Sequence, residues 1–312
     1  LTLFLSLVLA MNLFASTMDV AVDGLAVDVL RPHELGYGNI AQVVGYKVGM
    51  LVGGGVLVWA GRWLEWRGIF LAMAGLVAAA LLVTLRMREP ASEEAPGDAE
   101  QTDVVAVLGL LWRALRSPGA AWLLLFVGTY KLGESMADAM FKPFLFDAGY
   151  DASQIGLWVG TWGLLFSLTG SVAGGWVASR YGVFRAVAWT ATLRALAVAG
   201  EWWLSWVEPT VPRVVSVIAT EQFFGGALTT AMFAYMMSRV DRSIGATHFT
   251  FLATVEVAGK LAATWISGFV AQSLGYTSLF GWATVLAIAF LALLWPMGRA
   301  TPNHRARMTE PE

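Results

Sequence analysis

The amino-acid sequence predicts an all-α protein that crosses a membrane many times. Hydrophobic residues make up 57% of the 312 residues, and charged residues only 13%. The hydrophobic residues gather in successive charge-poor runs, each long enough to span a bilayer as a helix of about 17–25 residues. Within lipid, only helices and closed barrels satisfy their own backbone hydrogen bonds, and runs of this length are typical of helices. We therefore expect a polytopic helical membrane protein.

Nine such runs follow one another, and we expect nine transmembrane helices. The third and the ninth carry no charge between 69 and 85 and between 279 and 295, so we expect them to face lipid. Charged residues fall on most of the other runs. The nine runs cover residues 3–29, 39–60, 68–86, 119–142, 154–178, 184–206, 213–238, 247–272 and 277–297.

A polar, acidic stretch from 86 to 103 separates the third run from the fourth and is the one candidate domain boundary. A short amphipathic segment, 104–116, follows it, ends in arginines and is expected to lie on the membrane surface. The predicted organisation is a partial N-terminal bundle of three helices at 1–86, a cytoplasmic linker with an amphipathic helix at 87–117, a six-helix bundle at 118–298 and a cytoplasmic tail at 299–312.

Three helices followed by six predict two halves, of which the first is incomplete. Many secondary transporters consist of paired six-helix halves. We expect the helices present to be the fourth to the twelfth of twelve, so that the fold lacks its first three helices. Twelve of the twenty basic residues lie in one set of alternate loops and three in the other. Because cytoplasmic loops hold the excess of lysine and arginine, the linker and the C-terminus are predicted to be cytoplasmic.

The composition also narrows the chemistry. The chain contains no cysteine and only three scattered histidines, so we expect no disulfide, no thiolate chemistry, no metal centre and no cofactor. A net charge of −2 gives no sign of a nucleic-acid partner, and we expect none. Functional chemistry must therefore rest on carboxylates, lysines and arginines.

Carboxylates lie along the first run. Asp19 and Asp23 are four residues apart and share one helical face. A carboxylate in the hydrocarbon region costs roughly 2.5–3.5 kcal/mol on insertion scales, so it is seldom retained without a role. We expect this face to line a polar pathway, to which Lys47 on the second run adds a charge. The alternative is a buried structural salt bridge.

The fourth run carries a stripe of alternating charge, in which Lys131, Glu134, Asp138 and Lys142 follow helical spacing. Lys131 should lie near mid-membrane, where it could hold an anionic group of a substrate. Glu134 or Asp138 could exchange a proton if burial disfavours the charged form. The alternative is an internal ion network that compensates itself and fixes helix packing.

Further charges extend this pathway to other helices. Glu256 and Lys260 form an acid–base pair four residues apart on the eighth run. Glu221, on the seventh, has no base within a turn, so we interpret it as a proton site or as the partner of a group on another helix. Arg194 and Glu201, seven residues apart on the sixth run, are the exception to this distribution.

The segment Gly175-Trp-Val-Ala-Ser-Arg-Tyr-Gly-Val-Phe-Arg185 resembles a loop signature of the major facilitator superfamily. In that signature a glycine precedes an acidic and a basic residue, a second glycine and further basic residues. Gly175, Arg180, Gly182 and Arg185 match it, whereas Ser179 stands where the family prefers aspartate. The resemblance implies the fold of that superfamily, with this loop on the cytoplasmic side.

Three further stretches, residues 18–24, 38–51 and 130–140, resemble the branch of the superfamily that holds muropeptide permeases and acetyl-coenzyme A transporters. This resemblance implies a proton symporter in a bacterial inner membrane that imports a muropeptide-like or another polar or anionic solute. It also implies that the branch's polar pathway positions are occupied here by Asp19, Asp23, Lys131, Glu134 and Asp138.

The expected protein is therefore a monomeric permease with a small-molecule substrate, protons and the lipid bilayer as its partners. Two alternatives stay open. One is a drug or metabolite exporter of the same superfamily, because the sequence does not fix the direction of transport. The other is an intramembrane prenyltransferase, in which Asp19-x-x-x-Asp23 and Asp147-x-x-x-Asp151 would bind a diphosphate through magnesium. We expect no enzyme, because the two pairs are predicted near different sides of the membrane.

Overall fold

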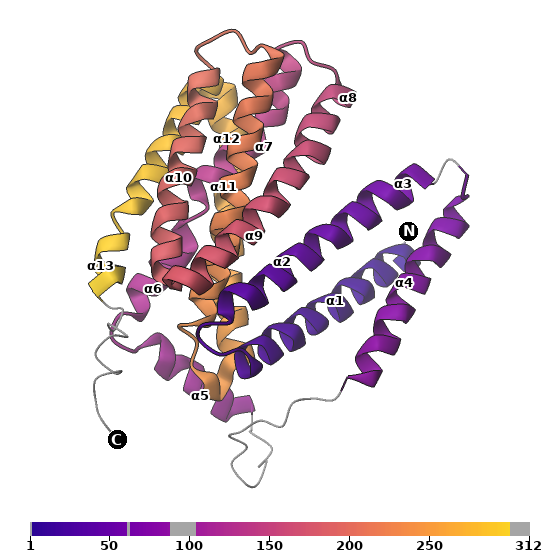
Figure 1. Ribbon diagram of the computed structural model, residues 1–312, viewed down its shortest axis with the longest axis vertical. Helices are drawn as coiled ribbons and strands as arrows, with labels where there is room; N and C mark the ends of the chain where they lie inside the picture. The colour runs from indigo at the N-terminus through magenta and orange to yellow at the C-terminus, as the bar shows by residue number, and fades with distance from the viewer. Residues whose placement is uncertain (1, 61–62, 88–103, 300–312) are drawn as a thin grey trace. The chain divides into compact units, whose positions relative to one another are not determined.

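The computed structural model of the chain describes residues 2–60, 63–87 and 104–299. All regular secondary structure in these ranges is helical (Figure 1). The predicted all-α class is therefore confirmed. Residues 88–103 of the predicted linker and residues 300–312 of the predicted tail lie outside the described ranges, and the predicted domain boundaries stay predictions.

The chain forms two compact units, one of Leu1–Ile40 with Gln101–Glu312 and one of Ala41–Glu100. Helix α2 (Leu35–Met50) continues in the smaller unit as a π-helical stretch, η1 (Leu51–Val56), and a last turn, α3 (Leu57–Ala60). Helix α4 (Trp66–Arg86) follows and buries none of its residues. That its uncharged stretch, 69–85, faces lipid stays a prediction.

The larger unit contains α1 (Thr2–Val29) and, after the residues of the linker, the short helix α5 (Val104–Leu115). The segment formed by α6 (Ala120–Thr129) and α7 (Leu132–Asp147) is bent by 88° from α5. The remaining elements are α8 (Ala152–Ile155), η2 (Gly156–Trp162), α9 (Gly163–Tyr181), α10 (Val183–Leu204), α11 (Val211–Met237), η3 (Arg242–Ile244), α12 (Gly245–Leu291) and α13 (Leu294–Arg299).

Five helical stretches of the described residues are long and apolar enough to cross a membrane, or up to six if the bent segment is counted as one span. Each of the nine predicted runs lies on helix for most of its length. The two counts differ partly because α12 holds two predicted runs in one element. The chain therefore has the apolar helices of a polytopic membrane protein.

Helix α12 reverses direction at one residue. Gly275 has φ 79° and ψ 168°, a backbone conformation that glycine adopts far more readily than other residues. His248 near the start of α12 and Met297 on α13 line the same small cavity, so the chain returns to the end from which it started (Figure 1). Two long helical segments are thus joined without a loop.

Helices α9 and α11 approach each other closely. A Cβ atom added to Gly170 would lie 1.9 Å from the carbonyl oxygen of Phe223, and one added to Gly174 would lie 2.2 Å from that of Ala227. Small residues permit this kind of backbone contact between membrane helices. The contact fixes α11, which carries Glu221, against α9.

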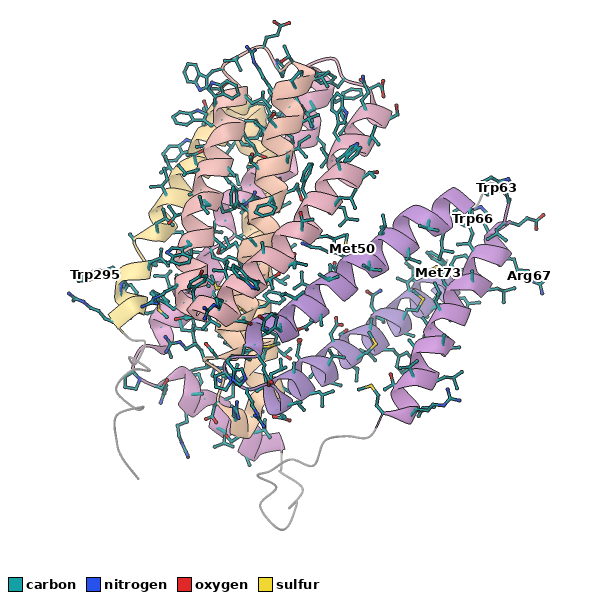
Figure 2. The ribbon with its side chains drawn as sticks, viewed as in Figure 1. Met50, Trp63, Trp66, Arg67, Met73 and Trp295 are labelled. Carbon is teal, nitrogen blue, oxygen red and sulfur yellow. The ribbon has the colours of Figure 1, made fainter. Side chains whose placement is uncertain are left out.

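Tryptophans lie at helix ends, which is typical of residues at a membrane interface. In the smaller unit, Trp63 and Trp66 stand at the entry to α4 and are exposed (Figure 2). In the larger unit, Trp295 on α13 is exposed, and the guanidinium carbon of Arg299 lies 3.7 Å from its ring centroid.

Candidate functional site

The strongest candidate site surrounds Arg194, at the middle of α10, which is only 3% exposed. Its Nε donates a hydrogen bond of 3.2 Å to a carboxylate oxygen of Glu134 on α7. Its Nη2 lies 3.8 Å from Oδ1 of Asp138 on the same helix. Its two Nη groups also contact the carboxylate and the backbone carbonyl of Glu221 on α11. One guanidinium thus joins three helices.

Glu201 lies two turns further along α10 and is 1% exposed. Its Oε2 has no hydrogen-bond partner among the described residues. One carboxylate oxygen each of Asp138, Glu201 and Glu221 lies within 4.8 Å of the other two. We name Arg194, Glu134, Asp138, Glu201 and Glu221 together the arginine cluster.

The arginine cluster contains four acidic groups and one base, so it would carry a large negative excess if all were ionised. Buried charge without compensation is strongly unfavourable, and the cluster must gain positive charge. One carboxylate oxygen of Asp138 lies within 4.8 Å of one of Glu221, and two carboxylates this close repel each other when both are ionised, so a proton between them would relieve the repulsion. The same spacing would admit a metal ion, but Arg194 already places a positive charge against both groups. The geometry therefore favours protons.

A second group surrounds Glu256 on α12, which is 4% exposed. The Nζ atoms of Lys131 and Lys260 each lie 3.6 Å from Glu256 Oε1, and the hydroxyl of Tyr130 donates to the same oxygen at 3.3 Å. We name these four residues the Glu256 group. It has two bases and one acid, so its charge is opposite in sign to that of the arginine cluster.

A cavity of about 200 Å³ opens beside the arginine cluster. Its volume is below the roughly 300–1,000 Å³ typical of small-molecule pockets. In this conformation it therefore has room for water and small groups beside the carboxylates. It is lined by Asp138, Phe141, Lys142, Val159, Ile218, Glu221 and Gln222.

The predicted site residues fall into three sets. Glu134, Asp138 and Glu221 meet at Arg194, whereas Lys131 and Lys260 meet at Glu256. Three charges of the predicted stripe, Lys131, Glu134 and Asp138, therefore pair with residues of other helices. The remaining predicted residues lie outside both groups: Asp19 is exposed and Asp23 half-buried on α1, Lys47 is half-buried on α2, and Lys142 is exposed and lines the cavity.

Arg194 and Glu201 belong to the site although the sequence analysis set them apart as an exception. The signal was present in the sequence. An arginine at the middle of an apolar run needs an acidic partner, and Glu221 has no base within a turn on its own helix. Matching the acids and bases of different helices would have paired Arg194 with Glu221.

The loop motif forms the turn between α9 and α10. Gly182 has φ 92° and ψ 144°, and Arg180 and Arg185 are exposed. A Cβ atom added to Gly175 would lie 2.6 Å from the carbonyl oxygen of Gly36. Ser179, where the family prefers aspartate, accepts a hydrogen bond of 3.1 Å from the backbone N–H of Tyr37 in the first turn of α2. Its hydroxyl oxygen thus satisfies a backbone N–H group in the first turn of α2, which has no partner within the helix.

Comparisons with known proteins identify relatives of the chain as a whole. A profile of the Major Facilitator Superfamily matches residues 1–250. The anhydromuropeptide permease of Escherichia coli (strain K12) is 30% identical over 290 residues, which are 90% of this chain and 57% of that protein. The putative transporter AmpG 4 of Rickettsia felis is 26% identical and covers 94% of this chain and 72% of its own. The chain thus spans little more than half the length of the first of these relatives.

One solved structure shows the same fold. It is a bacterial homologue of the iron transporter ferroportin in an outward-facing state, with a TM-score of 0.63 and 16% sequence identity. The match covers 90% of this chain and 69% of that one. At this identity the likeness concerns the fold alone.

Proposed function

The chain belongs to the major facilitator superfamily, and we propose on that basis that it works as a secondary active transporter. The superfamily also argues against the intramembrane enzyme. Two of the aspartates that the enzyme would need have structural partners, because Asp147 accepts a hydrogen bond from the hydroxyl of Tyr276 and Asp151 caps α8.

The observation that carries the proposal is the arginine cluster, in which Arg194, Glu201 and Glu221 are buried and Asp138 is exposed beside the cavity. Four acidic groups around one guanidinium form a site whose charge changes with each proton bound. When the Asp138–Glu221 pair loses its shared proton, both carboxylates compete for Arg194, and the hold of Arg194 on Glu134 weakens. Proton binding on one side of the membrane and release on the other would thereby alter the contacts between α7, α10 and α11. This is the coupling that alternating access requires.

We propose that the substrate is a polar, anionic solute of the muropeptide type. The 30% identity to an anhydromuropeptide permease supports this class. The Glu256 group supports it independently, because its two ammonium groups share one carboxylate and the side chain of Lys260 is 41% exposed. A carboxylate of a solute can replace Glu256 as the partner of one lysine. Import is proposed on the same similarity, and export by a related carrier is the second candidate.

The proposed membrane location and orientation rest on the same family assignment. We propose a monomeric, multi-pass protein of the bacterial inner membrane with a cytoplasmic C-terminus. The exposed arginines of the α9–α10 turn support this orientation, and so does Arg242, which donates a hydrogen bond of 3.3 Å to the carbonyl oxygen of Leu30 in the neighbouring loop.

The test is uptake of labelled anhydromuropeptide by cells that lack their own permease and express the complete gene product. We expect uptake that a protonophore abolishes and that Glu134→Gln greatly reduces. Glu208→Gln, which changes an exposed acid in the loop before α11, is the matched control and should leave uptake unchanged. Absence of uptake, with the protein shown to be in the membrane, would overturn the substrate class. Uptake that persists with the protonophore would overturn proton coupling.

A further inference from the structure

Glu201 is the one member of the arginine cluster without an ion-pair partner among the described residues. It is 1% exposed, and its Oε2 has no hydrogen-bond partner there. A buried carboxylate with an unpartnered oxygen is far more costly when ionised than when protonated, and Arg194, the base that acts on it, already pairs with the other three acids.

The charged groups around Glu201 come from three helices. Glu134 and Asp138 on α7, Glu221 on α11 and Arg194 on α10 all act on it electrostatically. Three of these four are acidic, and the guanidinium is already engaged with them.

The charged residues of the other helices packed on α10 do not compensate the negative charge around Glu201. The charged residues of α12 have partners elsewhere, because Glu256 pairs with Lys131 and Lys260, and Nδ1 of His248 accepts the backbone N–H of Asp241. Helix α9 carries one charged residue, Arg180, which is exposed at its end. The remaining bases of α7 and α11, Lys142 and Arg213, are exposed, so negative charge dominates the buried surroundings of Glu201.

We infer that Glu201 is a second proton-binding residue, so that the arginine cluster stores two protons: one shared by Asp138 and Glu221, and one on Glu201. The close approach of the three carboxyl groups carries this inference together with the unpartnered oxygen. The inference extends the proton coupling proposed above. It rests on that proposal only for the role of the stored proton in transport, and not for the presence of the proton on Glu201.

The geometry also gives the second proton a route. The oxygen atoms of Glu201, Asp138 and Glu221 lie within 4.8 Å of one another, so rotation of one side chain can bring a carboxyl O–H onto a neighbouring carboxylate. The proton leaves one oxygen and binds another, and no further reactant is needed. Asp138 and Glu221 also line the cavity, whereas Glu201 is not among its lining residues. Protons therefore exchange with water through the pair, and Glu201 holds a reserve behind it.

The experiment is infrared spectroscopy of the purified protein in lipid nanodiscs, following the C=O stretching bands of protonated carboxyl groups with pH and in deuterated buffer. We expect Glu201→Gln to remove one such band at neutral pH and Glu201→Asp to retain it at a shifted position. Glu208→Gln should leave the spectrum unchanged. An unchanged spectrum of Glu201→Gln, or bands that vanish on addition of Na⁺ or Ca²⁺, would overturn the inference in favour of an ionised or cation-bound Glu201.

Two controls separate a folding defect of the variant from a failure of the proposed transport function. Glutamine mimics the protonated acid in size and charge, so the variant should unfold at the temperature of the unaltered protein or above it. If the variant does not fold, the pH titration of the unaltered protein still decides, because two distinct titrating bands are expected and one would contradict the inference. The infrared result does not depend on transport. A Glu201 band without muropeptide uptake would therefore refute the proposed substrate and leave the proton site standing.

Discussion

Arg194 shows how one buried side chain can define a site. Its guanidinium has five N–H donors, and here they serve the carboxylates of Glu134 and Glu221 and a backbone carbonyl, with Asp138 close by. A lysine in its place would have a single charged centre and would not reach all three helices with the same geometry. The arrangement thus depends on arginine specifically.

Replacement of Arg194 by glutamine should be severe. It leaves several acidic groups buried without compensation, and breaking a buried ion pair from one side costs about 3–5 kcal/mol. We expect a large loss of thermal stability and no uptake, measured by intrinsic tryptophan fluorescence during unfolding and by transport. The control is Arg213→Gln, an exposed arginine at the start of α11, which should change stability little. Equal stability of the two variants would contradict the assignment of Arg194 as the centre of the site.

Most acids of the candidate site, though not Glu201, were predicted from the sequence, and their partners were not. Glu134, Asp138, Glu221 and Glu256 stand out because carboxylates are costly in apolar runs. Which base each one meets depends on the rotation and packing of separate helices, and helical spacing describes only one helix at a time. For this reason the stripe was interpreted as a possible self-compensated network, whereas three of its four charges pair with residues of α10 and α12.

At the scale of the elements, α9 and α11 are held together by glycine. The backbone of α11 passes Gly174 so closely that a methyl group there would overlap the carbonyl of Ala227. We expect Gly174→Ala to destabilise the protein by about 1–3 kcal/mol through overpacking. Gly268→Ala on α12 is the matched control, because a Cβ there meets nothing within 4 Å among the described residues. Similar unfolding temperatures for the two variants would show that the helices can separate freely.

The start of α8 gives a pH dependence. Hydrogen bonds from the hydroxyl of Ser153 and the backbone N–H of Gln154 lower the pKa of the Asp151 cap below its usual value. Because the folded-state pKa is the lower one, the stabilisation by the ionised cap is complete above the unfolded-state pKa and is lost as pH falls through the folded-state pKa. Asp151→Ala should therefore lower the unfolding temperature at pH 7, and the gap should narrow below about pH 4. A gap that does not vary with pH would refute this account.

The elements themselves were largely predictable, since apolar runs of spanning length determine helices in lipid. The interruptions within these helices were less predictable from the sequence. The π-helical stretches η1 and η2 and the break at Tyr130–Lys131 leave no periodic signal, because they arise from packing within runs that are apolar throughout. Gly275 was one glycine among 33, and only its backbone conformation distinguishes it.

At the scale of the whole molecule, the absence of cysteine makes the orientation directly measurable. We expect a single cysteine at position 208, introduced as Glu208→Cys, to react with a membrane-impermeant maleimide in intact spheroplasts. A cysteine at position 243, introduced as Ser243→Cys between α11 and α12, should react only after the membrane is permeabilised. The reason is that the loops at that end hold the excess of arginine. The reverse labelling pattern would place the C-terminus outside.

Sequence and structure also differ in what they reveal about transport. The resemblance of the loop motif and of three stretches identified the superfamily, and the matching profile confirms it. No pattern in the sequence gives the volume of the cavity, which depends on the conformation and is here too small for a large solute. A substrate of the proposed class therefore needs a more open state than this one.

The reversal at Gly275 has a mechanical consequence. With no loop between them, the two arms of α12 have no slack at that end and cannot slide or part there independently. We therefore expect a movement of one arm to be transmitted to the other through Gly275. One arm holds Glu256, whose ties to Lys131 and Lys260 form the second charged group. We expect a displacement that starts among those charges to reach the second arm of α12, which ends at Leu291, through this direct connection.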